Sequence, residues 1–209
     1  MPASLPRGLY LLTPDLDDDA QLLARVRPLL DSGAVTWLQY RNKSVGDAQR
    51  ARQATALLTL CRAAGVPLII NDDAALALEL GAAGLHREDT TTPLAELRAA
   101  LGPDALLGAS CYDQPALAYE AVEEGASYVS FGAFFASRSK PGPHRATTAV
   151  FDATAGLRVP RVAIGGLTPA NAGPIIAAGA DLVAAIGGVF DAPDPVATAR
   201  ALRAFFDQD

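Results

Sequence analysis

The chain has 209 residues, of which 50% are hydrophobic and 19% are charged, and its formal net charge is −6. This length suits a single domain spanning residues 1–209, with enough apolar residues for a large core. The acidic balance argues against nucleic-acid binding, which needs a basic face, and no stretch approaches the roughly 18 uninterrupted apolar residues of a membrane helix. Because the first residues also lack the features of a secretory signal and the two cysteines are isolated, we expect a cytoplasmic protein with reduced thiols.

Short apolar segments alternate with alanine- and leucine-rich stretches along the chain. The apolar segments are mostly continuous rather than alternating in polarity, as expected of parallel strands that are buried on both faces. Eight strands are therefore predicted, at residues 8–13, 35–41, 67–72, 83–87, 106–111, 128–134, 161–166 and 182–188.

The stretches between these segments have the features of helices. Within residues 47–65 the apolar side chains follow helical spacing, and Gly65 supplies a C-terminal stop. In "LTPANAG", Thr168 is expected at an N-cap and Pro169 at the first helical position. Residues 190–206 read as a closing amphipathic helix.

Eight strand–helix units in a chain of this length predict a (β/α)8 TIM barrel. The alternative is a doubly wound open sheet, which usually has fewer strands and a glycine-rich fingerprint after the first one. Here the first strand ends "LLTPD" without such a fingerprint. The sequence therefore favours the barrel.

Polar residues collect at the predicted carboxyl ends of the strands, where barrel enzymes place their chemistry. Lys43 and Lys140 are the only lysines of the chain, and both fall at these ends. The other polar residues there include Gln39, Arg41, Asn71, Asp72, His86, Glu88, Asp89, Ser110, Ser137 and Ser139. This concentration favours a functional site over chance.

Two diglycines follow the last two predicted strands, at Gly165–Gly166 and Gly187–Gly188. The loops after strands 7 and 8 are the common phosphate site of barrel enzymes. Glycines let backbone N–H groups approach a phosphate, and a helix starting near Pro169 would add its positive end. We therefore predict a monophosphate site here, although glycine also serves simple turns.

Two carboxylates, Asp72 and Asp89, lie at the ends of neighbouring predicted strands. Such a pair facing basic side chains suits a Mg²⁺ ion that bridges to a polyphosphate. Arg41, Lys43 and Lys140 would hold the same anion. The alternative is a ring of solvated salt bridges around the rim, and the neighbouring Asp73 is a candidate helix N-cap.

Other polar and bulky residues are given structural roles. His86 is interpreted as a hydrogen-bonded wall residue rather than a base, and Cys111 as a packing residue. Trp37 and Tyr40 are expected to fill the barrel or an interface. The segment 136–147 has the glycine, prolines and charge of a mobile lid.

Seven segments, in this order along the chain, resemble those of the thiamine phosphate synthase family. They are "LQYRNK", "LIIND", "GLHRED", "GASCYD", "FGAFFASRSK", "VAIGGLTPAN" and "GADLVAAIGGVF". The resemblance covers essentially the whole chain and implies a transferase. A hydroxymethylpyrimidine diphosphate and a thiazole phosphate would be joined to give thiamine phosphate and pyrophosphate, the diphosphate leaving before the thiazole nitrogen captures the pyrimidine carbocation. The partners would be small molecules, the cofactor Mg²⁺, and a homodimer is possible.

The resemblance also implies roles for single residues. The substrate-binding set is Gln39, Arg41, Lys43, Asn71, Ser110, Ser137, Ser139, Lys140, Gly166, Ile186 and Gly187. Within it, the residues expected to act in catalysis are Arg41, Lys43, Ser110 and Lys140. Asp72 and Asp89 match the magnesium ligands. Because the segment after the fourth strand is two residues shorter than is usual in the family, Glu88 is an alternative to Asp89.

Two other functions stay open. A thiazole tautomerase of the same fold would not need the diphosphate-binding residues, and no histidine is expected near Ser110, where its base would be sought. A non-catalytic phosphate-binding barrel would not need the paired carboxylates and lysines. Release of pyrophosphate separates these alternatives.

Overall fold

The computed structural model describes residues 5–136 and 145–207. Its strands form a closed parallel barrel in the order β1 to β8, and β1 also pairs with β8. The strands are β1 Gly8–Leu12, β2 Val35–Tyr40, β3 Leu68–Asn71, β4 Gly84–Arg87, β5 Leu106–Tyr112, β6 Tyr128–Phe131, β7 Arg161–Ile164 and β8 Leu182–Ala185. The predicted (β/α)8 barrel is confirmed.

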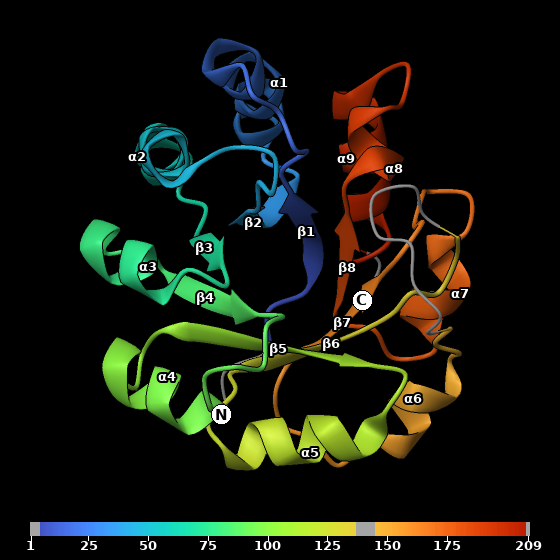
Figure 1. Ribbon diagram of the computed structural model, residues 1–209. Helices are drawn as coiled ribbons and strands as arrows, with labels where there is room; N and C mark the ends of the chain where they lie inside the picture. Colours follow the sequence, from blue (N-terminus) through green and yellow to red (C-terminus); the bar gives the residue numbers. More distant parts are fainter. Residues whose placement is uncertain (1–4, 137–144, 208–209) are drawn as a thin grey trace.

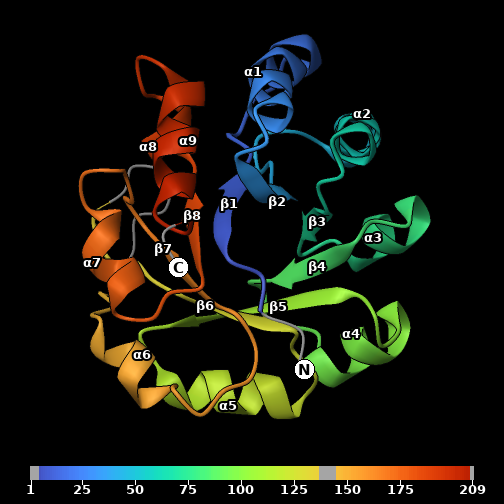
Figure 2. The same ribbon diagram turned by 180° about the vertical axis from the view of Figure 1, so that it is seen from behind.

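Helices follow the strands in sequence and surround the barrel (Figures 1 and 2). They are α1 Asp19–Asp31, α2 Asp47–Ala64, α3 Ala74–Leu80, α4 Leu94–Leu101, α5 Pro115–Glu123, α6 Ala149–Ala153, α7 Ala172–Ala177, α8 Gly187–Phe190 and α9 Pro195–Ala204. Within the described residues, no helix combines the length and the apolar character needed to cross a bilayer.

The barrel is buried on both faces, which explains the continuous apolar strands. The larger cluster of buried side chains lies between the strands and the helices. A smaller cluster fills the interior of the barrel and includes Tyr10, Trp37 and Tyr128. Their rings pack edge-on or tilted, with centroids 5.0 to 5.8 Å apart. The interior is thus a packed aromatic core, as the volume of an eight-stranded barrel requires.

Several helix and strand boundaries differ from the predictions. Helix α7 begins at Ala172 instead of Pro169, since a turn occupies residues 168–171, so Thr168 is not its N-cap. Strand β8 ends at Ala185, and the second diglycine opens the short helix α8 instead of ending a strand. The last helix, α9, begins at Pro195, because Asp194 caps it.

Other signals for helix ends are confirmed. Helix α2 ends before Gly65, which adopts the left-handed conformation with φ 67°. The carboxylate of Asp73 accepts a hydrogen bond from the backbone of Leu76 and caps α3. Asp73 is therefore a structural residue, and the neighbouring Asp72 is left for another role.

Candidate active site

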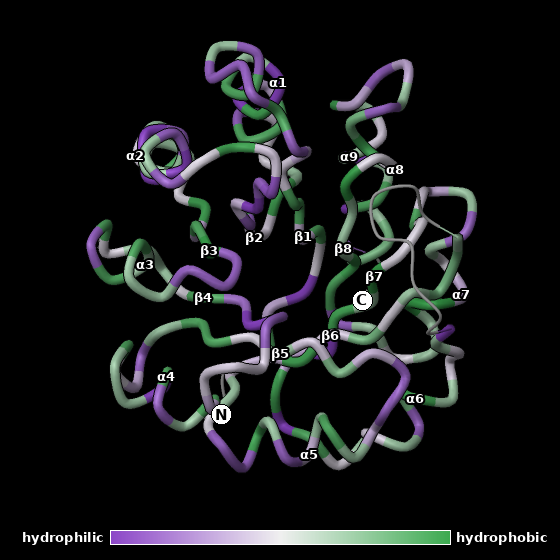
Figure 3. The backbone as a smooth tube through the Cα atoms, viewed as in Figure 1, coloured by the Kyte–Doolittle hydropathy of each residue, from purple (hydrophilic) through white to green (hydrophobic). Residues whose placement is uncertain are grey.

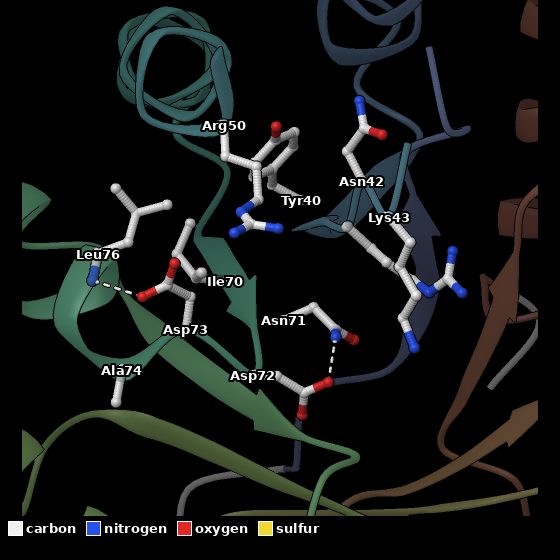
Figure 4. A pocket seen from close by; sticks show the side chains of 11 residues that line it. Tyr40, Asn42, Lys43, Arg50, Ile70, Asn71, Asp72, Asp73, Ala74 and Leu76 are labelled. Carbon is white, nitrogen blue, oxygen red and sulfur yellow. Dashed lines mark hydrogen bonds between the residues drawn. The ribbon is translucent and has the colours of Figure 1, made fainter. Parts of the chain in front are cut away.

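Hydrophilic segments follow β2, β3 and β4 at their carboxyl ends (Figure 3). A cavity of about 350 Å³ lies at the carboxyl ends of β2 and β3, between helices α2 and α3 (Figure 4). The residues that line it are Tyr40, Arg41, Asn42, Lys43, Arg50, Ile70, Asn71, Asp72, Asp73, Ala74 and Leu76. Four of the predicted site residues, Arg41, Lys43, Asn71 and Asp72, are thus brought together.

Arg41 is held rigidly at the end of β2. Its side chain is only 8% exposed and pairs with both carboxylate oxygens of Asp15, at 3.0 and 3.2 Å. Its backbone N–H and carbonyl both bond to the hydroxyl of Thr13. The Nε of Arg41 is buried and has no partner in the described part of the chain. One donor of this fixed cation is therefore available to an acceptor.

Lys43 and Arg50 supply two more positive charges to the cavity, and both point into the space above Asn71 and Asp72 (Figure 4). The Nζ of Lys43 lies 3.3 Å from a carboxylate oxygen of Glu88. Arg50 comes from the first turn of α2 and pairs with Asp47. Its Nε is also buried without a partner among the described residues.

Asp72 joins the end of β3 to the segment after β4. Its Oδ1 accepts the backbone N–H groups of Glu88 and Asp89 at 2.6 and 2.9 Å. Its Oδ2 accepts the side-chain amide of Asn71 at 2.7 Å. Asp72 has φ 58°, a left-handed conformation that Asp and Asn tolerate better than most residues. Asp72 is partly exposed and has a structural function as well as any role toward a metal.

Asn71 presents an acceptor to the cavity, because its amide nitrogen is used by Asp72. Its Oδ1 is buried and has no partner within the described residues. An amide oxygen cannot donate to a phosphate. The geometry therefore suits a cation or an amine better than the direct diphosphate contact that was expected of Asn71.

The remaining candidate metal ligands lie at the rim. Asp89 is exposed, and its Oδ1 accepts the backbone N–H of Thr91 at 2.9 Å. Glu88 is less exposed and reaches toward Lys43. In residues 5–136 and 145–207 no three acidic, histidine or cysteine side chains form a ready-made metal cluster. The oxygen donors of Asp72 and Asn71 nevertheless fit a hard cation that takes its other ligands from water and phosphate.

Gln39, His86 and Ser110 lie on the inner side of the barrel. His86 is buried; its Nδ1 lies 3.0 Å from the hydroxyl of Tyr128 and its Nε2 lies 3.0 Å from Ser110 Oγ. The expectation that no histidine would lie near Ser110 is therefore wrong, because adjacent strands bring the two together. The interpretation of His86 as a hydrogen-bonded wall residue agrees with both contacts.

Cys111 is buried. Burial raises the pKa of its thiol to about 12, so the unreactive thiol form prevails at neutral pH. The side chain is therefore a packing residue, as expected. Trp37 and Tyr40, which were expected to fill the barrel or an interface, are both buried. Trp37 lies in the barrel interior, and the hydroxyl of Tyr40 donates to Gln53 at 2.8 Å.

The diglycines at the ends of β7 and β8 are constrained by the chain itself. Gly166 has φ 62°, and a Cβ there would lie 2.6 Å from the carbonyl oxygen of Ala136. A Cβ on Gly188 would lie 2.0 Å from the carbonyl oxygen of Leu167. Ile186 is partly buried and, with Gly187, starts helix α8. Close packing of these loops thus accounts for Gly166 and Gly188, and the phosphate site remains a prediction.

Ser137, Ser139 and Lys140 lie outside the described residues, as does most of the segment predicted as a lid. Two residues of the site were missed by the sequence analysis. Asp15, which holds Arg41, follows the first strand and has the same strand-end signal as Asp72. Arg50 stands in a helix with many surface arginines, and nothing in the sequence separates it from them.

A closed barrel with cations, an amide and a carboxylate around a cavity at its strand ends defines an enzyme that binds an anionic small molecule. Residues 9–189 match the family model described as thiamine monophosphate synthase. The chain therefore belongs to the thiamine monophosphate synthase family, and the predictions of family and of a transferase are confirmed.

Relatives extend the match over nearly the whole chain. A thiamine-phosphate synthase of Xanthomonas campestris pv. campestris is 52% identical over 202 residues, 97% of each protein. One of Xylella fastidiosa is 51% identical over 206 residues, 98% of this chain and 86% of that protein. The solved structure of a thiamine phosphate pyrophosphorylase from Pyrococcus furiosus superposes with a TM-score of 0.83 at 24% identity, covering 96% of each chain, and supports the fold.

Proposed function

We propose that the chain joins a hydroxymethylpyrimidine diphosphate to a thiazole phosphate, giving thiamine phosphate and pyrophosphate. The observation that carries the proposal is the set of cations around the cavity. Arg41, Lys43 and Arg50 all line it, and two of them have a buried Nε without a partner in the described part of the chain. A diphosphate supplies the acceptors that such donors need.

The same cations explain how the reaction is assisted. When the C–O bond of the pyrimidine diphosphate breaks, negative charge grows on the leaving oxygen and positive charge on the pyrimidine methylene carbon. Arg41 is fixed beforehand by Asp15 and Thr13, so its donors need not reorganise as charge develops. The thiazole nitrogen then supplies the electron pair of the new C–N bond.

Asp72 and the Oδ1 of Asn71 would hold a Mg²⁺ ion, with Glu88 or Asp89 as a further ligand. The ion would add positive charge at the departing diphosphate. Both carboxylate oxygens of Asp72 already accept hydrogen bonds, and each oxygen still has a lone pair for a cation. Of the two further candidates, Glu88 is less exposed than Asp89.

The second substrate is assigned to the other side of the barrel opening. The backbone around Gly166, Ile186 and Gly187 would hold the thiazole phosphate, and Ser110 at the end of β5 would contact the pyrimidine. Ser137, Ser139 and Lys140 are proposed as further substrate ligands on the sequence resemblance. A cytoplasmic location and a homodimer likewise stay predictions.

A coupled assay of pyrophosphate release tests this function. Both substrates together with Mg²⁺ should give stoichiometric pyrophosphate and thiamine phosphate. The proximity of His86 to Ser110 removes one reason for setting aside a thiazole tautomerase, so the thiazole tautomer should be supplied separately as a control. Isomerisation of the thiazole without pyrophosphate release would favour the tautomerase, and binding without any turnover would favour a phosphate-binding protein.

A further inference from the structure

A continuous line of hydrogen bonds crosses the interior of the barrel from β2 to β5. We call it the hydroxyl chain, and its members are Gln39, Tyr10, Tyr128, His86 and Ser110. The successive distances between donor and acceptor atoms are 2.7, 2.7, 3.0 and 3.0 Å. The first four members are buried, and Ser110 is partly exposed. The chain thus leads from the interior to the open end of the barrel.

The direction of these hydrogen bonds is set at Gln39. Its amide nitrogen can only donate, so the oxygen of Tyr10 accepts from it. Within the described residues, the hydroxyl of Tyr10 has Gln39 and Tyr128 as its partners. The proton of Tyr10 must therefore point to Tyr128, because a buried hydroxyl proton without an acceptor costs free energy.

The same reasoning passes along the chain to Ser110. Tyr128 accepts from Tyr10 and so donates its own proton to Nδ1 of His86. A neutral imidazole that accepts at Nδ1 carries its proton at Nε2. That proton is donated to Ser110 Oγ, which leaves the hydroxyl proton of Ser110 for another acceptor.

Two features keep the hydroxyl chain in this state. Burial raises the pKa of both Tyr10 and Tyr128, so each keeps its proton at any physiological pH. Packing fixes the rings, because Trp37 lies against both tyrosines and His86 stacks on Tyr128 with centroids 5.6 Å apart. The rings therefore have little freedom to exchange partners.

We propose that the hydroxyl chain fixes His86 as its Nε2–H tautomer and thereby directs the hydroxyl proton of Ser110 toward the pyrimidine diphosphate. Tyr10 and Tyr128 are then positioning residues that act through His86. The acceptor is one of the proposed substrates, so this inference rests on the proposed function. The tautomer itself is a property of the protein alone.

Nitrogen NMR of protein labelled with ¹⁵N-histidine reads the tautomer directly. The chain has two histidines, His86 and His144, and His144→Gln assigns the resonances. In mildly alkaline buffer, where a histidine is ordinarily neutral, Nε2 of His86 should be protonated and Nδ1 should be unprotonated and hydrogen-bonded. A protonated Nδ1 would overturn the proposal, whether or not any variant folds.

Tyr128→Phe tests the connection to catalysis. The Nδ1 resonance should move toward that of a nitrogen that accepts no hydrogen bond, and kcat should fall roughly tenfold, as expected for the loss of one hydrogen bond. The KM for the thiazole phosphate should stay nearly unchanged. Tyr119→Phe is the matched control, since it removes a hydroxyl that bonds outside the barrel, to the carbonyl of Ala153.

An unchanged Nδ1 resonance or an unchanged kcat in a folded Tyr128→Phe would overturn the proposal. Failure of the proposed function looks different. The wild-type protein would then release no pyrophosphate, while the NMR measurement, which uses no substrate, would still report the tautomer.

Discussion

Replacing Asp72 with asparagine should cost both stability and activity, for separable reasons. The carboxylate accepts three hydrogen bonds, from Asn71 and from the backbone N–H groups of Glu88 and Asp89. Asparagine keeps the shape and tolerates the left-handed backbone. Its single oxygen can still accept from the two backbone N–H groups, but without the charge that makes such bonds roughly twice as strong, and its NH2 group cannot accept from the amide of Asn71. Because the site is partly exposed to water, the loss should be about 1–2 kcal/mol.

For a domain of this size, that loss corresponds to a fall in Tm of about 3–6 °C. Asp89→Asn is the matched control. Asp89 is exposed, and its carboxylate accepts a hydrogen bond from the backbone N–H of Thr91, so its substitution should lower Tm by about 1 °C. Thermal unfolding followed by circular dichroism without magnesium measures both. Equal melting temperatures for the two variants would refute the assignment of Asp72 as the link between β3 and the segment after β4.

The metal role of Asp72 is measured by turnover against Mg²⁺ concentration. Asp72→Asn should lose most activity and regain part of it at high magnesium, since asparagine is a poorer ligand for a hard cation. Asp89→Asn should be affected less. Normal activity of Asp72→Asn at limiting magnesium would leave Asp72 with its structural role only.

Three further outcomes are expected. Arg50→Met should raise the KM for the pyrimidine diphosphate about fivefold, through loss of one cation at the cavity. Arg52→Met in the same helix should not raise it, because Arg52 is exposed, pairs with Asp19 and does not line the cavity; equal KM values for the two variants would remove Arg50 from the site. Gly108→Val should lower stability by about 3 kcal/mol, because a Cβ there would lie 2.0 Å from the ring of Tyr128, and an unchanged Tm would contradict this packing. Burial raises the pKa of the Cys111 thiol from 9.0 to about 12. As pH rises from about 9 to 12, the unfolded state therefore loses the thiol proton before the folded state does, and the free energy of unfolding should fall. In denaturant titrations over that range, Cys111→Ser should show a smaller fall in the free energy of unfolding.

The barrel was predictable because its strands are buried on both faces and so form continuous apolar segments. For the same reason, the members of the hydroxyl chain could not be predicted from the sequence. In a strand with alternating polarity the inward residues can be read from the sequence, but nothing in the strand around Tyr10 shows which of its side chains faces the interior. The inward orientation of Tyr128 could not be predicted for the same reason.

The site was only partly predictable for a different reason. Strand-end position identified Arg41, Lys43 and Asp72, since the ends of parallel strands converge in a barrel. Residue type did not reveal that Asp72 would bind backbone N–H groups, because this depends on the path of the segment after β4. The boundary of β8 was misplaced because diglycine fits a strand end and a helix start equally well.

The hydrogen bond between Tyr10 and Tyr128 also bears on how the chain folds. It joins residues 118 positions apart, in β1 and β6. Until β6 has been added, the hydroxyl of Tyr10 cannot be both buried and fully paired, and an unpaired buried hydroxyl is costly. A compact half-barrel made of the first strands is therefore penalised, which favours cooperative closure of the whole ring over stepwise accumulation of stable fragments.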